Sequence, residues 1–206
     1  VGQPLDSPAV VKAAELVKQL FEKYTTPDAV GANWAVSSGH FLAGRTAMII
    51  DGPWLISLIN DQVEDPTQIG VAVAPTYKGG KGQPGLIVTD AMTPWAAGKQ
   101  PTKEREEAIV DFMKYFTSEE SVKIITLEGN LPLAVKATFT EEELKAADPL
   151  LAQVIVIGSK APEAVVSMTR ILKPPASEKL PALLEGLALG QISPEEFAKK
   201  LQEFNK

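Results

Sequence analysis

The chain has 206 residues, 45% of them hydrophobic and 22% charged, a composition typical of a globular protein with a substantial core. Its 20 basic and 26 acidic residues give a formal net charge of -6, which argues against nucleic acid or an anionic membrane as a partner, because both favour basic surfaces. With no cysteine, disulfides and thiolate metal sites are excluded, and we expect neither a metal nor a cofactor.

The ends of the chain and its apolar runs bear on its cellular location. No apolar stretch approaches the ~20 residues of a membrane-spanning helix. Val1 is neither an initiator methionine nor the start of a signal peptide, so we expect the chain to begin at a cut in a longer sequence. Any export signal would then lie upstream.

The first half of the chain mixes predicted helices with short predicted strands. Ser7 and Pro8 can start a helix whose apolar residues recur at helical spacing as far as Tyr24. The apolar run at 46–50 shows no alternation, which predicts a strand buried on both faces. The helices expected here are 8–24, 37–43 and 54–60, and the strands are 46–50, 69–74 and 86–88.

Helices dominate the second half. One is expected over 102–116, and two capping-box patterns follow, Thr117 to Glu120 and Thr140 to Glu143. The residues expected on the buried face of the first of these helices are Ala108, Ile109, Phe112, Met113 and Phe116. Further helices are expected over 149–158, over 180–190, and after the cap formed by Ser193, Pro194 and Glu196. Because few strands serve many helices, we expect an incomplete sheet, and residues 85–101 are typical of a connection between two bodies.

Evidence for an enzyme is weak. His40 is the only histidine, and Ser37 and Ser38 lie too near it in sequence to converge on it as a triad. We interpret His40 as a half-exposed helix residue. Asp51 and Asp90 could act as a glycosidase pair if the fold brought them together. A carbohydrate-active enzyme therefore remains the alternative class of protein.

The segment from Phe41 to Trp54 carries the most specific pattern of the chain. It predicts a helix, a buried strand and a tight turn that presents an indole at the carboxyl end of the strand. Ligands of open α/β sheets bind at such ends. A flat indole suits the C–H face of a sugar ring, whereas packing under the turn would make Trp54 a core residue.

This segment resembles the family 1 extracellular solute-binding proteins, in which F-x-x-G-x-(T/A)-A-M, a short strand and (D/N)-G-P-W occur in the same order. The resemblance covers all 206 residues but matches only about the C-terminal half of a family member. Further matches follow in order at residues 69–75, 104–116, 117–120, 129–132 and 190–196.

The resemblance implies an α/β fold of the periplasmic binding protein-like (type II) class, here a helix-rich C-terminal lobe with an incomplete mixed sheet. Members of the family have two lobes that close on a ligand by hinge motion. Residues 1–95 and 150–206 would belong to the C-terminal lobe. Residues 96–149 would cross the hinge and belong to the N-terminal lobe, the rest of which is missing from this chain.

The implied function is the substrate-binding component of an ABC importer, not an enzyme. Such a protein captures a small ligand, here a sugar or oligosaccharide, between its lobes and delivers it to a membrane permease, so an extracellular or periplasmic location is expected. The third alternative is a structural fragment that no longer binds. For half a cleft, we expect weak or undetectable binding.

Four site residues follow from the resemblance. Trp54 matches the tryptophan that stacks on sugar, and Asp90 lies where members place a polar ligand contact. Met168 and Arg170 fall in a loop that lines the cleft. Maltodextrin-binding members carry a second stacking tryptophan where residues 174–179 have no aromatic, so the sugar stays open. Trp34 and Trp95 are interpreted as packing residues.

Overall fold

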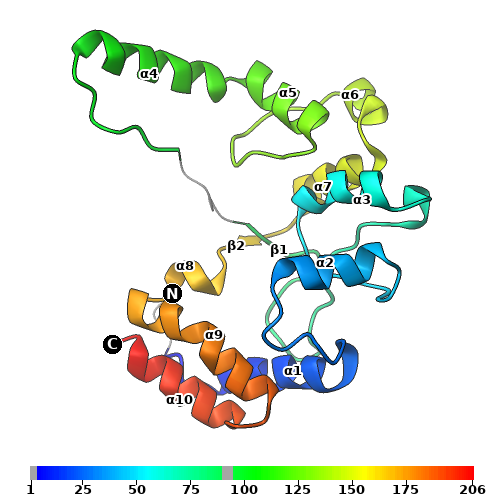
Figure 1. The fold of residues 1–206 in the computed structure, drawn as a ribbon, viewed down its shortest axis with the longest axis vertical. Helices are drawn as coiled ribbons and strands as arrows, with labels where there is room; N and C mark the ends of the chain where they lie inside the picture. Colours follow the sequence, from blue (N-terminus) through cyan, green and yellow to red (C-terminus); the bar gives the residue numbers. More distant parts are fainter. Residues whose placement is uncertain (1–3, 90–94) are drawn as a thin grey trace. The chain divides into compact units, whose positions relative to one another are not determined.

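The computed structural model describes residues 4–89 and 95–206, most of which lie in helices (Figure 1). Contacts divide the chain into two compact units: unit 1 comprises Val1–Ile49 and Val166–Lys206, and unit 2 comprises Ile50–Val165. No helix within the described ranges is long and apolar enough to cross a membrane. Unit 1 contains α1 (Pro8–Tyr24), α2 (Trp34–Leu42), α8 (Met168–Ile171), α9 (Pro174–Ala188) and α10 (Pro194–Phe204). Unit 2 contains η1 (Pro53–Leu55), α3 (Ile56–Gln62), η2 (Pro66–Gln68), β1 (Ile87–Val88), α4 (Lys103–Phe116), α5 (Glu119–Gly129), α6 (Glu141–Ala146), α7 (Pro149–Lys160) and β2 (Ala164–Val165).

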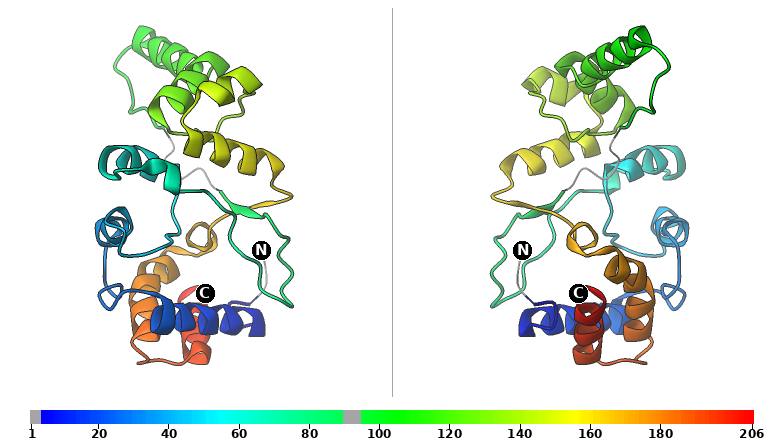
Figure 2. Two further views of the ribbon diagram at one scale, coloured as in Figure 1. Left: turned by 90° about the vertical axis from the view of Figure 1, so that its right-hand side faces the viewer. Right: turned by 90° about the vertical axis from the view of Figure 1, so that its left-hand side faces the viewer.

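The core of unit 1 lies where α1, α9 and α10 pack on one another (Figure 2). Leu187 of α9 and Leu201 of α10 are completely buried there. The predicted cap of α10 is confirmed: the Ser193 hydroxyl accepts the N–H of Glu196, whose carboxylate accepts the N–H of Ser193. This reciprocal pair of hydrogen bonds begins α10, whose apolar face packs in the core. The buried members of the cluster are Ala14, Leu172, Ala176, Leu180, Leu183, Leu187, Phe197 and Leu201.

The turn between α9 and α10 depends on Gly190. Its φ of 69° lies in the left-handed region, where glycine carries no steric penalty. The N–H of Gln191 donates to the carbonyl of Gly186 at 2.8 Å, and that of Gly190 donates to Leu187 at 3.1 Å. This pairing satisfies two carbonyls of the last helical turn and brings Ile192 back against the core.

Unit 2 contains a two-stranded parallel sheet in which Ile87 pairs with Ala164 and Val88 with Val165. The strand predicted at 86–88 is therefore confirmed. Side chains attach other segments to α7: Asn60 donates to Asp148 at 2.6 Å, and the N–H of Val71 donates to Gln153 at 3.0 Å. The sheet is small and incomplete, as expected.

The strands predicted at 46–50 and 69–74 are wrong, because the structure assigns both segments to irregular backbone. Burial on both faces is also wrong for the first segment, where Met48 is 86% exposed and Ile50 is 91% exposed. A strand needs a neighbour that pairs its N–H and C=O groups. In the described part of the chain, neither segment has such a neighbour.

The helix predicted at 102–116 is confirmed as α4, but its buried face is wrong. No residue of α4 is buried, and Phe112 is 51% exposed. Phe116 contacts the rings of Trp95 and Phe112, with centroids 4.5 and 5.8 Å away. The apolar face of α4, defined as Ile109, Phe112, Met113 and Phe116, is therefore only partly covered by the described residues.

Capping defines the starts of α5 and α6. The first capping-box prediction is wrong by one residue, since the cap of α5 is Ser118, whose hydroxyl accepts the N–H of Ser121. The second is confirmed in full at Thr140 and Glu143. The Glu143 carboxylate accepts the Thr140 N–H at 2.7 Å and meets Lys123 Nζ at 2.9 and 3.0 Å. These contacts, that of the Thr140 N–H first, lower the pKa of Glu143 from its ordinary 4.5.

We expect the Glu143 contacts to stabilise unit 2 fully above pH 4.5 and to be lost as the pH falls through the lowered pKa. The sign follows because protonation is easier in the unfolded chain than in the folded one. Glu143→Gln should therefore flatten the acid limb of the urea-midpoint profile. Glu142→Gln, on the exposed side of the same helix, is the control and should leave the profile unchanged.

Candidate functional site

Trp54 lies on η1, the single helical turn that follows Gly52. Pro53 suits the first position of this turn, because its fixed φ is helical and its missing N–H is not needed there. The next residues, Leu55 and Ile56, are buried, so the turn is anchored from its C-terminal side. Trp54 itself remains 50% exposed. The sequence thus presents a large aromatic side chain on a short, firmly held turn.

The indole of Trp54 rests on the backbone of Gly52. A Cβ atom at Gly52 would lie 2.3 Å from Cη2, 2.3 Å from Cζ3 and 2.7 Å from Cζ2 of Trp54. Three adjacent ring carbons at such similar distances indicate an approach to the ring face, since an edge-on approach would leave the third carbon much farther away. One face of the indole is therefore covered by Gly52 while half of the side chain stays open to solvent.

The carboxylate of Asp51 is hydrogen-bonded within the turn. Its Oδ1 accepts the N–H of Gly52 at 2.8 Å, and the Gly52 carbonyl accepts the N–H of Leu55 at 3.1 Å. The partner considered for it, Asp90, lies outside the described residues. The acidic pair of the glycosidase alternative therefore stays a prediction.

Met168 and Arg170 share the four-residue helix α8 of unit 1, and both are exposed. Leu172, which follows the helix, is buried in the core of unit 1, and the N–H of Lys173 donates to Asn205 at 2.7 Å. The structure thus brings these two predicted site residues together on one turn. Trp54 belongs to the other unit.

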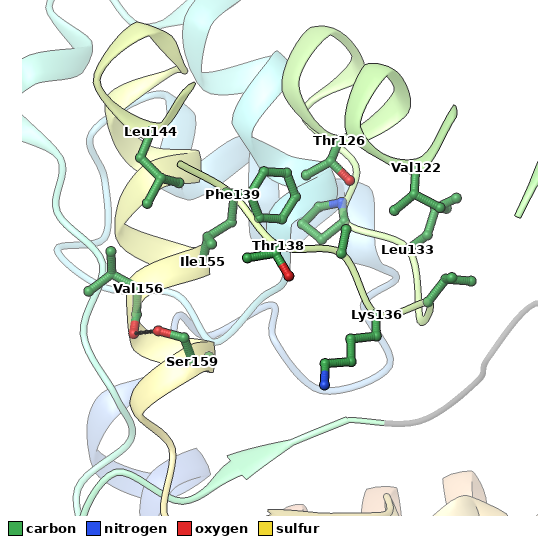
Figure 3. Close-up of a pocket in the computed structure, with 14 residues that line it drawn as sticks. Val122, Thr126, Leu133, Lys136, Thr138, Phe139, Leu144, Ile155, Val156 and Ser159 are labelled. Carbon is green, nitrogen blue, oxygen red and sulfur yellow. Dashed lines mark hydrogen bonds between the residues drawn. The ribbon is translucent and has the colours of Figure 1, made fainter. Parts of the chain in front are cut away.

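A hollow lies in unit 2, between α5, the loop that follows it, and α7 (Figure 3). It measures about 560 Å³, and its lining is mostly apolar, including Val122, Leu133, Phe139 and Ile155. The hydroxyl of Ser159 is engaged with a carbonyl of its own helix. Sugar sites need several convergent polar groups, so this apolar hollow is poorly suited to a sugar. Of the predicted site residues that the structure describes, Trp54, Met168 and Arg170, none lines this hollow.

A smaller hollow of about 280 Å³ lies in unit 1 against Trp34 and the loop before α2. Trp54, Met168 and Arg170 do not line this hollow either. Among the described residues, no group of three or more His, Asp or Glu could hold a metal ion.

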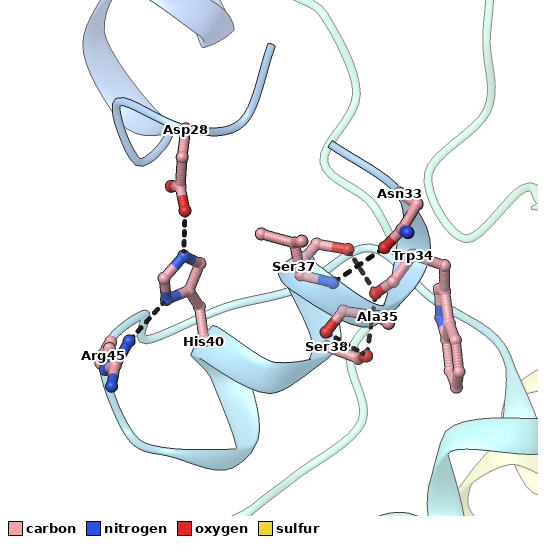
Figure 4. Close-up of polar contacts among 9 residues, drawn as sticks. Asp28, Asn33, Trp34, Ala35, Ser37, Ser38, His40 and Arg45 are labelled. Carbon is pink, nitrogen blue, oxygen red and sulfur yellow. Dashed lines mark hydrogen bonds and ion pairs between the residues drawn. The ribbon is translucent and has the colours of Figure 1, made fainter. Parts of the chain in front are cut away.

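His40 forms a loop contact that the sequence analysis missed (Figure 4). Its Nε2 lies 2.9 Å from Oδ2 of Asp28, and Nη1 of Arg45 lies 3.5 Å from its Nδ1. The hydrogen bond from His40 is the largest cause of the lowered pKa of Asp28. The hydroxyls of Ser37 and Ser38 both donate to the carbonyl of Trp34. These contacts join the loop before α2 to the helix and engage both hydroxyls with backbone.

Two contacts could have been sought from the sequence. Asp28 precedes His40 by twelve positions and is the nearest acid upstream. Gly52 lies two positions before Trp54 in D-G-P-W, where a glycine without a conformational reason signals a close approach. Neither spacing by itself predicts the distance between the groups.

Three solved structures share the fold of this chain. One is a chitin oligosaccharide binding protein (23% identity, TM-score 0.79), which matches over 98% of this chain and 49% of its own. Another comes from work on xylan utilization by the thermophilic bacterium Caldanaerobius polysaccharolyticus (20% identity, TM-score 0.75). It matches over 98% of this chain and 51% of its own. A Streptococcus pneumoniae solute-binding protein in complex with the blood group A-trisaccharide also matches (15% identity, TM-score 0.76). The match covers 97% of this chain and 49% of that protein. The chain spans about half the length of these proteins.

The fold and the family agree. The helix-rich arrangement with a small sheet matches that of the solute-binding neighbours, as the sequence analysis expected. Residues 1–123, which include the segment from Phe41 to Trp54, match the sequence profile described as bacterial extracellular solute-binding protein. The chain belongs to the bacterial extracellular solute-binding protein family.

Proposed function

We propose that this chain carries part of the sugar site of a solute-binding protein that serves an ABC importer. The observation that supports it most is the half-exposed indole of Trp54, held face-down on the clamped turn at Gly52. Such a plate suits the C–H face of a pyranose ring. The neighbours described as binding chitin oligosaccharide and blood group A-trisaccharide point to the same ligand class.

The proposed site is completed by an N-terminal lobe, of which this chain would carry only residues 96–149. In this proposal residues 1–95 and 150–206 belong to the C-terminal lobe and residues 96–149 to the N-terminal lobe. Trp54, Asp90, Met168 and Arg170 then face the cleft between them. The partly covered apolar face of α4 and the apolar hollow both favour this arrangement, because apolar surface of that extent is normally buried against protein.

The partner and the location follow from the family. Closure of the two lobes on a sugar would signal a membrane permease to accept it. The extracellular solute-binding family implies an extracellular or periplasmic location. A carbohydrate-active enzyme remains the second class, and release of products from any sugar tested would favour it.

A sugar titration of this chain tests the proposal. Chitin oligosaccharides, xylo-oligosaccharides and the blood group A-trisaccharide are added while NMR follows the indole N–H of Trp54. We expect a saturable shift at that signal with weak affinity, because half of the cleft is absent. Micromolar affinity by calorimetry would contradict the half-site. No shift at Trp54 with any of these sugars would contradict the stacking role.

A further inference from the structure

We infer that Gly52 is a positioning residue for sugar binding: its missing side chain leaves the space in which the indole of Trp54 lies. The inference rests on the proposed function for its consequence and on the geometry of the turn for its mechanism. It assigns a specific task to a residue that touches no ligand itself.

The glycine is needed for space and not for backbone conformation. Gly52 has φ of -124° and ψ of 178°, an extended conformation that any residue adopts. Gly190 is the contrasting case, because its positive φ is the reason for glycine there. At Gly52 a methyl group would instead enter the face of the six-membered ring of Trp54, 2.3 Å from its two nearest carbons.

The backbone of this turn cannot easily move to admit a methyl group. The Gly52 N–H is bound by Asp51 and its carbonyl by the N–H of Leu55. Pro53 restricts the following φ, and the side chain of Leu55 is buried. The indole, in contrast, is half exposed and turns about two side-chain torsions. A side chain at position 52 therefore displaces the ring and leaves the turn in place.

Displacement of the indole should weaken binding, because a ring stacks on a sugar only when its face is oriented toward the sugar. Tryptophan supplies a large rigid surface with little conformational entropy to lose, provided that it is already held in the bound orientation. With Gly52, one face of the indole is fixed on the backbone before the ligand arrives. The ligand class that gains from this is a flat apolar surface, such as the C–H face of a sugar ring.

Gly52→Ala tests the inference, with Gly82→Ala as its matched control in the same unit, since a Cβ at Gly82 meets nothing within 4 Å. In the unsubstituted chain, the Hα of Gly52 that faces the ring should be shifted upfield by the ring current, and Trp54→Ala should abolish that shift. Gly52→Ala should move the indole N–H signal of Trp54, while Gly82→Ala should not. The urea midpoint should stay close to that of the unsubstituted chain in both variants.

Sugar binding supplies the second readout. Gly52→Ala should weaken the sugar affinity by about tenfold, as Trp54→Ala does, with the affinity of every variant measured from the NMR signals of the sugar. Adding Gly52→Ala to Trp54→Ala should cause no further loss, because no ring remains to be displaced. If no sugar binds, the proposed function fails, but the Hα and indole signals still decide the positioning role. The inference would be overturned if Gly52→Ala left the indole N–H signal of Trp54 unmoved. It would also be overturned if Gly52→Ala lowered the urea midpoint equally in the presence of Trp54 and in the Trp54→Ala background.

Discussion

Leu187→Ala is expected to destabilise unit 1 by about 2–5 kcal/mol, the range for truncating a buried leucine. Leu187 is completely buried in the cluster formed by α1, α9 and α10, so its truncation removes apolar contacts and leaves a cavity in the core. Domains are typically stable by only about 5–15 kcal/mol, so the loss is a large part of the total. Leu187→Ala should therefore leave unit 1 marginally stable or unfolded.

Urea unfolding of unit 1 measures this loss. Trp34 is the only tryptophan of unit 1, so replacing Trp54 and Trp95 by Phe makes fluorescence report on that unit. Leu189→Ala is the matched control, because the same substitution two residues away acts on a side chain that is 53% exposed. It should change the free energy by no more than about 0.5 kcal/mol. Equal effects at both positions would contradict the assigned core.

Trp54→Ala is expected to weaken sugar binding by at least about tenfold, or about 1.4 kcal/mol, as truncation of a central aromatic contact does. Fold stability should change little, because half of the side chain is exposed and its contact is with the backbone of Gly52. In this variant the sugar affinity should therefore fall while the free energy of unfolding stays nearly the same. Affinity is measured from the NMR signals of the sugar, because this variant has no Trp54 indole to follow, and stability is measured by urea unfolding of the same sample.

Trp34→Ala is the control for Trp54. Its side chain is exposed to a similar degree, 46%, but it lines the smaller hollow of unit 1. Sugar affinity should stay unchanged in this variant. If Trp54→Ala also left the affinity unchanged, Trp54 would be a packing residue and the site would lie elsewhere.

The sequence predicted features that depend on neighbours a few residues away. The capping boxes at Thr140 and Ser193 and the bounds of α1 were predicted correctly. In each case the groups that decide the structure lie within four positions of one another. The family was also recognised from one contiguous segment, Phe41 to Trp54, because its motif spans neighbouring elements.

The wrong predictions of burial and of strands share one physical cause. Met48, Ile50 and Phe112 have the side chains of buried residues, yet they are exposed. Burial and strand pairing are relations between two surfaces, and the pattern describes only one of them. For residues 46–50 the second surface is absent from the described chain, and for α4 it is incomplete there.

The candidate site divides in the same way. The sequence, through its family resemblance, made Trp54 a candidate on the local motif D-G-P-W. It also made Met168 and Arg170 candidates, which one short helix carries. Only the tertiary structure decided that the indole lies face-down on Gly52 and that His40 binds Asp28. The reason is that side-chain torsions and loop closure, which no spacing specifies, determine which groups come into contact.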